Sequence, residues 1–469
     1  MLMMLVTSLL KNVLWLLRYP SFVKEYIGPY QHVGIIQTRL YDDSGDGHPI
    51  NPTVQCQIHY PAATKNKKRR QVGFHPYFRP EAVIGLADYS RQPTKLLEFL
   101  SMKQHPCLIN LTPYGSYDEN NTSQKKKFPV IIFSHGLGGC YEMYTELCSQ
   151  LSSCGYVVIA VEHEDGSGLY AQDVKTKQPI YYKRPDDTPY SRQKAINFRK
   201  PFFEQRVQEL TNIITKLKKS GTTTIVGSKN YDDEDDKTAN VLKQVLNCID
   251  LSSSDTNGGI SLVGHSFGGA TMVKAIQDES FQNACGGIQG NGGKISSLCL
   301  LDCWAFSLDD DTINKGCLDV PTLNIISENW ATTNTEVYKL KEMLLNSKLD
   351  INNGRSFYIP NSVHSSFSDA CNWLPNLVNR KVSYTQGLKE KKHETISIAA
   401  KACIQHIQQK QKSKESLDVD GLVPYSLVDE AEKTNKVVTT QMTTATSTMS
   451  STSTEAAGVE QQKKELVSS

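Results

Sequence analysis

Ser266 has the sequence context of a catalytic nucleophile. It is the central residue of Gly264-His265-Ser266-Phe267-Gly268, and the apolar run Ile260-Ser-Leu-Val263 comes directly before it. The small-residue segment 269–276 follows and has helical character. A buried strand, a sharp turn carrying one serine and then a helix form the nucleophile elbow, which exposes the hydroxyl beside a helix N-terminus. The pattern predicts a reactive serine, and the alternative is an ordinary glycine-rich turn between strand and helix.

A serine hydroxyl is a poor nucleophile at neutral pH, so it needs a histidine base and a carboxylate that orients the histidine. After an elbow of this kind the acid comes next in the chain and the histidine last, each in a loop after a strand. Asp302 ends the apolar run that starts at Ser296 and fits the acid position. Glu328, after the following apolar run, is the rival acid. We favour Asp302.

Three histidines follow the acid in the chain, namely His364, His393 and His406. His364 follows the extended run 355–360 and lies in a loop, whereas the other two lie in or near a lysine-rich helical segment. We therefore expect His364 to be the base.

An acyl-transfer site also needs donors for the oxyanion, and one is expected to be the amide of the residue after the serine, Phe267. The second should come from a loop after an earlier strand. Phe133-Ser-His-Gly-Leu-Gly-Gly139 has this form, because glycines let the backbone turn its amides inward, and Leu137 is the expected donor. We expect His135, His163 and His265, near other strand ends, to support loops by hydrogen bonding.

The elements around these residues alternate between strands and helices. Continuous apolar runs at 128–133 and 156–161 are typical of buried parallel strands, and a helical pattern separates them at 143–151. An amphipathic helix follows through 203–217, and further strands are expected at 297–301 and 322–326. This order predicts an α/β-hydrolase fold with a mostly parallel central sheet and helices on both faces. The catalytic domain is expected to span 28–411.

Both ends of the chain differ from this domain. Residues 1–27 begin with an apolar segment, interrupted by Lys11, whose polar side chains gather on one side of a helical wheel. We expect an interfacial helix that touches a membrane through residues 1–18, with a signal peptide or anchor, or a helix packed on the protein itself, as alternatives. Residues 412–469 turn to Ser/Thr-rich low complexity, which predicts a disordered tail.

The composition sets further limits. Among 469 residues, Lys+Arg total 51 and Asp+Glu 49, so the charge balance does not favour nucleic acid. The twelve cysteines are scattered without metal-type pairs, so we expect no metal and no cofactor. Their free-thiol character favours a cytoplasmic protein at a membrane surface, with secretion or anchoring as the alternative. The acidic run Asp232–Asp236 is interpreted as a solvated loop.

Five blocks of the chain, in this order and spacing, resemble the plasma-type and type II platelet-activating factor acetylhydrolases. The blocks are Phe133-Ser-His-Gly-Leu-Gly, Val161-Glu-His163, Gly264-His-Ser-Phe-Gly-Gly-Ala-Thr271, Leu301-Asp-Cys-Trp304 and Ser362-Val-His-Ser-Ser-Phe367.

The resemblance implies a Ser266–Asp302–His364 triad and a Leu137–Phe267 oxyanion hole. It also implies calcium-independent release of short or oxidised sn-2 acyl chains from phosphocholine lipids at a membrane or lipoprotein surface. Aromatic residues, above all Trp304 and Phe306, would line the acyl site or pack in the core. The chain departs from the family at Glu164-Asp165-Gly166, where relatives carry Arg-Asp-Arg, and this leaves the head group open.

Two other functions stay open at this point. A broader carboxylesterase or neutral lipase would use the same scaffold, and a non-catalytic interaction module would reuse the fold without its chemistry.

Overall fold

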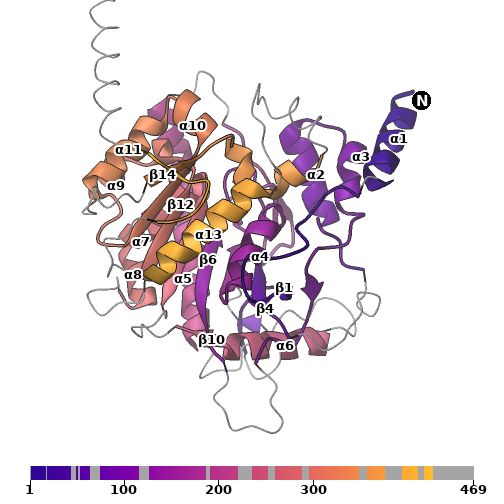
Figure 1. The fold of residues 1–469 in the computed structure, drawn as a ribbon, viewed down its shortest axis with the longest axis horizontal. Helices are drawn as coiled ribbons and strands as arrows, with labels where there is room; N and C mark the ends of the chain where they lie inside the picture. Colours follow the sequence, from indigo (N-terminus) through magenta and orange to yellow (C-terminus); the bar gives the residue numbers. More distant parts are fainter. Residues whose placement is uncertain are drawn as a thin grey trace, which may run out of the picture. The chain divides into compact units, whose positions relative to one another are not determined.

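A computed structural model describes residues 2–16, 18–43, 49–50, 53–63, 74–115, 126–185, 191–219, 235–251, 259–287, 295–347, 356–374, 393–409 and 417–425 (Figure 1). Met1–Pro424 form one compact unit, which holds every element described below. The end of the predicted tail and the first part of the acidic run, 232–234, lie outside the described residues.

A mixed, mostly parallel sheet runs through this unit. Its strand order is β15-β14-β13-β12-β11-β6-β7-β4-β1-β5, and β10 pairs with the end of β6. The six strands from β14 to β7 are all parallel, whereas β4 is antiparallel to both of its neighbours. The bounds are β1 Val33–Thr38, β4 Cys56–Pro61, β5 Leu108–Ile109, β6 Phe128–Ser134, β7 Val157–Val161, β10 Ile249–Asp250, β11 Ile260–His265, β12 Ile295–Leu301, β13 Thr322–Ser327, β14 Ser356–Ile359 and β15 Val423–Pro424.

Helices cover both faces of the sheet. The central strands are continuous apolar runs, so their side chains are apolar on both faces and both faces must be covered. Helices α4 (Thr145–Ser153) and α13 (Glu394–Gln409) pack together on one face, and α13 crosses in front of the sheet in Figure 1. Helices α5 (Arg192–Lys219) and α7 (Phe267–Gln277) contact each other, and α7 packs on the sheet's other face against β6, β11 and β12. The predicted fold class is confirmed.

Smaller elements connect these layers. The helices are α1 Leu2–Leu16, α2 Pro80–Ser90, α3 Thr94–Leu97, α6 Asp235–Asn247, α8 Glu279–Cys285, α9 Asp310–Lys315, α10 Glu328–Thr333 and α11 Val337–Asn346. The 3-10 turns are η2 Glu98–Leu100, η3 Tyr141–Tyr144, η4 Ala305–Ser307, η6 His364–Phe367 and η7 Asp369–Asn372. Two hairpins stand off the sheet, formed by β2 Asp42–Asp43 with β3 Pro49–Ile50 and by β8 Tyr170–Gln172 with β9 Pro179–Tyr181.

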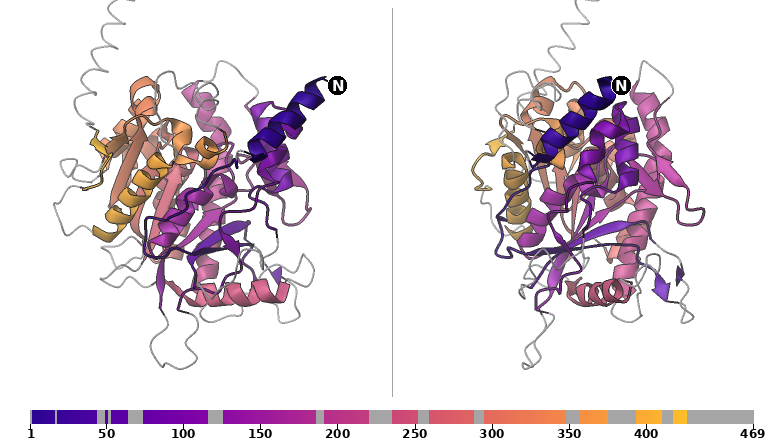
Figure 2. Two further views of the ribbon diagram at one scale, coloured as in Figure 1. Left: turned by 45° about the vertical axis from the view of Figure 1, so that its right-hand side comes forward. Right: turned by 90° about the vertical axis from the view of Figure 1, so that its right-hand side faces the viewer.

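Two findings bear on the chain ends. Helix α1 contacts α3 and η2, and its first residues point away from the sheet (Figure 2). Residues 417–424, which the sequence analysis assigns to the tail, contact the sheet, because β15 pairs antiparallel with β14 and Leu422 packs against the core. The domain boundaries at 27 and 411 stay predictions.

Two further expectations can be compared with the described residues. The acidic run was expected to form a loop, but its last two residues, Asp235 and Asp236, begin helix α6. All twelve cysteines lie in the described part of the chain, and none forms a disulfide there. Within the same residues, no helix combines the length and apolar character needed to cross a membrane.

Candidate active site

Ser266 occupies the turn between β11 and α7 in a strained backbone conformation. Its φ of 57° and ψ of −120° lie outside the regions that a residue with a side chain usually adopts. Close packing requires the glycines on both sides. A Cβ on Gly264 would lie 2.4 Å from the carbonyl oxygen of Gly268, and one on Gly268 would lie 2.0 Å from that of Ser134. The serine amide is fixed by a 2.9 Å bond to the Leu301 carbonyl.

Asp302 and His364 are brought together from loops after β12 and β14. The Nδ1 atom of His364 lies 3.1 Å from Oδ2 of Asp302. Asp302 is fully buried and accepts two further bonds of 2.6 Å, from the amide and the hydroxyl of Ser327. A carboxylate held in this way at Nδ1 leaves Nε2 of the imidazole as its proton-accepting atom, as a general base for a serine requires.

The rival residues have other partners. Glu328 accepts a 2.5 Å bond from the amide of Asn361, so it stabilises the loop before His364 and does not pair with the imidazole. His393 lies 2.7 Å from both oxygens of Glu146, and His406 lies 3.2 Å from the carbonyl of Pro321. Of the three histidines considered, the structure pairs only His364 with Asp302.

Two rings enclose the imidazole of His364. Trp330 stacks on it with a centroid separation of 3.9 Å and an interplanar angle of 24°. The ring of His265 lies 4.5 Å away on the β11 side. Burial, together with the nearby His364, holds the pKa of His265 well below its usual range, and its Nδ1 is 2.8 Å from the Tyr144 hydroxyl. A neutral His265 avoids repulsion when His364 takes up a proton.

The two predicted oxyanion donors lie next to the serine. Phe267 is the first residue of α7, and its amide has no acceptor among the described residues, as expected at a helix N-terminus. In the glycine-rich loop, the amides of Gly136, Gly138 and Gly139 all have acceptors, whereas that of Leu137 has none in the described chain. A Cβ on Gly136 would lie 2.9 Å from the Ser266 Cβ, so this loop approaches the serine closely.

A buried arginine holds the glycine-rich loop in place. Arg206, on α5, donates to the carbonyl of His135 at 2.9 Å and pairs with Asp165 at 2.9 Å. Asp165 also accepts from Ser167, whose carbonyl in turn accepts from Gly138. Within the segment that departs from the family pattern, Asp165 is therefore an internal support, and its side chain is buried.

His135 and His163 hydrogen-bond to strand ends and loops, as the sequence analysis expects. His163 lies between Ser134 and Glu209, at 2.8 and 2.6 Å, and His135 lies 2.8 Å from the Gly136 carbonyl through Nδ1. Both therefore hold strand ends and the loop, and neither is paired with Asp302 in the described chain.

An aromatic series leads from Phe267, the residue after Ser266, toward the surface. The ring of Phe267 lies 6.2 Å from Trp304, which lies 6.4 Å from Phe306, which lies 6.4 Å from the 40% exposed Tyr338. The indole nitrogen of Trp304 donates to Glu336, so the ring orientation is fixed. The predicted substrate-binding residues Trp304 and Phe306 are half-buried and adjacent to the site.

Arg199 is a buried cation without an acid partner. Its side chain is almost fully buried on α5, where its guanidinium lies 5.9 Å from the Phe267 ring. One Nη2 donor reaches the Tyr182 hydroxyl at 2.9 Å, but Nε and Nη1 have no partner in the described residues. The Tyr182 ring contacts Tyr89 at 4.8 Å, and Tyr89 in turn lies against Gly138. Arg199 therefore contacts Phe267 directly and the glycine-rich loop through Tyr182 and Tyr89.

Sequence reasoning missed both buried arginines, although a signal was present. Arg199, Phe203, Arg206 and Leu210 follow helical spacing, so both arginines lie on the apolar stripe of α5. A cation on a core-facing stripe needs a buried partner or a ligand.

In the described chain, one group of side chains has metal-ligand geometry: His265, Asp302 and His364, with ligand atoms within 4.8 Å. The oxygens of Asp302 are already directed at the donors of Ser327 and at the His364 ring. The donor set is therefore arranged for an aspartate–histidine pair and does not favour a cation.

The strained serine after a parallel strand, with an aspartate–histidine pair beyond the following strands, defines the class as α/β hydrolase. A solved ferulic acid esterase from Streptomyces cinnamoneus has the same fold, with a TM-score of 0.53 and 13% identity over 87% of this chain and 97% of that one. The model of the family described as platelet-activating factor acetylhydrolase, isoform II, matches residues 21–426. The chain belongs to this family.

Curated relatives agree with this assignment. A platelet-activating factor acetylhydrolase from Gallus gallus is 29% identical over 267 residues, which cover 52% of this chain and 53% of that protein. One from Cavia porcellus is 28% identical over 253 residues, 52% and 49% of the two chains. A putative phospholipase A2 from Schizosaccharomyces pombe is 26% identical over 284 residues, 54% and 62%. The match spans about half the length of the first of these relatives.

Proposed function

We propose that this protein hydrolyses the sn-2 acetyl or short, oxidised acyl ester of phosphocholine glycerolipids through a Ser266–His364–Asp302 triad. The observation that carries the proposal is the 3.1 Å Asp302–His364 pair in the same site as a serine on a strained elbow. Family membership and the names of the relatives, which include a phospholipase A2, support a lipid ester as substrate.

The reaction proceeds through an acyl-enzyme. Ser266 Oγ attacks the ester carbonyl as Nε2 of His364 takes its proton, and the amides of Leu137 and Phe267 donate to the oxyanion. The imidazolium then protonates the departing lysophospholipid oxygen, and water attacks the acyl-enzyme with His364 again as base. These groups supply both the general base and the oxyanion stabilisation, so we expect activity without calcium.

Arg199 supports a phosphate-bearing substrate over a neutral ester. A buried guanidinium with two unpartnered nitrogen donors, Nε and Nη1, costs stability, and an anion bound by these donors would offset the cost. Each unpartnered nitrogen of the guanidinium can donate a charge-assisted hydrogen bond to a phosphate oxygen. We assign Arg199 to the phosphate of the lipid head group.

The acyl chain would lie along Trp304 and Phe306, whose apolar rings continue from Phe267. Contact with the lipid surface is proposed through α1 in the segment 1–18, where Leu9 and Leu16 are among the most exposed apolar side chains.

The test is calcium-free hydrolysis of phosphatidylcholines with sn-2 acetyl, oxidised short-chain and long-chain acyl groups. Ser266→Ala is expected to lower kcat by at least about 10⁴-fold, because the nucleophile is lost. Ser280→Ala, a substitution of an exposed serine on α8, serves as the matched control. Full activity of Ser266→Ala would exclude the mechanism.

The same experiment separates the alternatives. Serine-dependent cleavage of long chains, triglycerides or soluble aryl esters in preference to short-chain phospholipids would assign the protein to the carboxylesterases or neutral lipases. No cleavage, with no fluorophosphonate labelling of Ser266, would support a non-catalytic module.

A further inference from the structure

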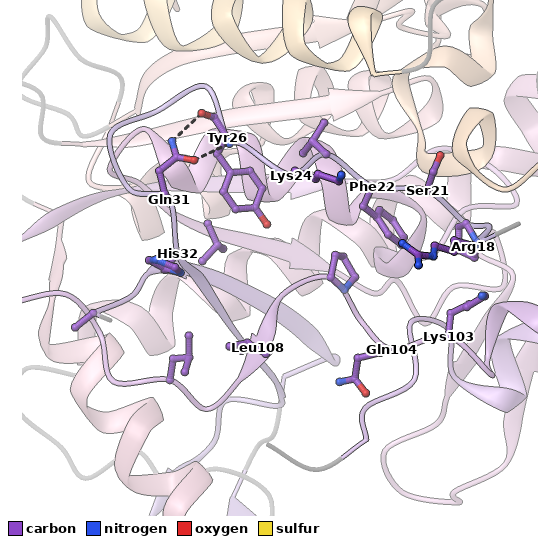
Figure 3. Close-up of a pocket in the computed structure, with 16 residues that line it drawn as sticks. Arg18, Ser21, Phe22, Lys24, Tyr26, Gln31, His32, Lys103, Gln104 and Leu108 are labelled. Carbon is purple, nitrogen blue, oxygen red and sulfur yellow. Dashed lines mark hydrogen bonds between the residues drawn. The ribbon is translucent and has the colours of Figure 1, made fainter. Parts of the chain in front are cut away.

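A cavity lies where α1 ends, and neither the proposed triad nor the proposed oxyanion residues line it. Its volume is about 830 Å³, and the segment after α1 forms one wall while residues near 103–111 form the other. Figure 3 shows Arg18 and Lys103 at one end of this pocket, Lys24 near its middle and His32 at the other end. We call it the basic pocket.

The lining of the basic pocket is strongly one-sided in charge. Arg18, Lys24 and Lys103 are cationic, and none of the 16 lining residues is an aspartate or glutamate. Ser21 adds a buried hydroxyl that has no hydrogen-bond partner in the described residues. Three cations in a lining that contains no acid are the arrangement expected for an anion site.

The cations are close enough to affect one another. Partial burial and the neighbouring Arg18 lower the pKa of Lys103, so the two positive charges repel without an anion between them. Lys103 is held in place by a 2.9 Å bond to the Trp15 carbonyl at the end of α1. The side chains of Arg18 and Lys24 make no hydrogen bond or ion pair in the described chain, and both are exposed. They are available to a ligand.

Helix α1 lies next to this pocket and is amphipathic, but its apolar side faces outward, whereas a surface helix of a soluble domain turns its apolar side toward the core. Lys11 faces the protein, where it pairs with Glu98 at 2.8 Å, and Leu14 is buried beside it. The apolar residues point outward instead, with exposures of 39–69%: Leu5, Val6, Leu9, Leu10, Val13, Trp15 and Leu16. The polar side of the helix is turned toward the protein at Lys11, because Glu98 provides its partner. An outward apolar face of this size is typical of contact with lipid or protein.

We propose that the basic pocket binds the phosphate of an anionic phospholipid in a membrane on which the apolar face of α1 lies. The apolar helix matches the acyl region, and the cations at its C-terminal end match the negatively charged head group. This docking site is separate from the proposed catalytic site. It rests on the proposed function only because a lipid substrate would bring the protein to a lipid surface.

The test measures binding of the full chain to sedimented vesicles in the Ser266→Ala background, so that no catalysis is needed. Vesicles contain phosphatidylcholine alone or with phosphatidylserine. Arg18→Gln/Lys24→Gln is expected to lower partitioning onto the phosphatidylserine vesicles about 30-fold, from about 1 kcal/mol per basic residue, and to leave phosphatidylcholine binding unchanged. Leu9→Ser/Leu16→Ser is expected to lower binding to both kinds of vesicle.

Lys175→Gln/Lys177→Gln is the matched control, because it removes two exposed positive charges from the β8–β9 turn. If this control lost as much binding to phosphatidylserine vesicles as Arg18→Gln/Lys24→Gln, the attraction would come from diffuse surface charge, and the proposed role of the basic pocket would be overturned. Wild-type binding by Arg18→Gln/Lys24→Gln would also overturn it, and so would full displacement from vesicles by inorganic phosphate, which would assign a soluble ligand. Hydrolysis of a soluble aryl ester by the same variants with Ser266 intact checks that they are folded.

Discussion

Arg199→Met is the substitution that tests the phosphate assignment most directly. Methionine fills a similar apolar volume on α5 but removes the buried charge and its two unpartnered donors. The bond to the Tyr182 hydroxyl is also lost. A binding role and a structural role for Arg199 therefore predict different combinations of activity and stability.

The expected magnitudes follow from the contacts. A hydrogen bond to a charged group contributes about 1.5–3 kcal/mol, so losing two bonds to phosphate costs about 3 kcal/mol or more, or at least about 100-fold in kcat/KM for a short-chain phosphatidylcholine. A neutral aryl ester makes no such bonds, so its kcat/KM should change little. Replacement of a buried charge by an apolar group is often neutral or stabilising by about 1–4 kcal/mol, which the lost Tyr182 bond reduces by about 1 kcal/mol.

The assay compares kcat/KM for the two substrates and the free energy of unfolding in denaturant. Arg199→Lys keeps the charge without the planar fork and should fall between wild type and Arg199→Met on the phospholipid. Lys200→Met is the control, since this lysine is an exposed cation on the same helix.

One pattern would refute the reasoning. If Arg199→Met lost stability and lost activity equally on both substrates, Arg199 would be a structural cation and the phosphate would be bound elsewhere.

Two further predictions concern the loop and the core. Gly136→Ala should lower kcat about 100- to 1000-fold. The added methyl group would lie 2.9 Å from the Cβ of Ser266 and would displace the loop that carries the proposed oxyanion amide of Leu137. Unchanged turnover at saturating substrate would contradict this prediction. Burial lowers the pKa of His59 from 6.5 to about 3, so stability present at neutral pH is lost as the pH falls below 6.5, by about 2 kcal/mol at pH 5. His59→Gln should remove that loss in denaturant titrations at pH 7.5 and 5, whereas His32→Gln, at an exposed position, should keep the wild-type slope.

Much of the fold could be predicted because its signals are local. The apolar runs that became β6, β7, β12 and β13 are short stretches of sequence whose burial requires a covered parallel sheet. The elbow around Ser266 was equally readable, since the glycines that permit the tight turn lie within two residues of the serine.

The partners in the site are a different matter, because they depend on proximity between distant segments. Asp302 and His364 are 62 positions apart, and sequence order alone left Glu328 as a rival until the structure paired it with Asn361. The orientation of α1 was decided by Glu98, 87 positions from Lys11.

The sequence by itself therefore determined the strand-and-helix order and the place of Ser266 on a tight turn, since short-range sterics and hydrophobic periodicity act between neighbours. Only the tertiary structure decided which charges are buried and with what partner. Arg206 meets Asp165 across 41 positions, whereas Arg199, seven residues earlier on the same helix, meets no acid among the described residues. Whether a buried charge finds a counterion depends on how separate elements pack, and no local pattern encodes that distance.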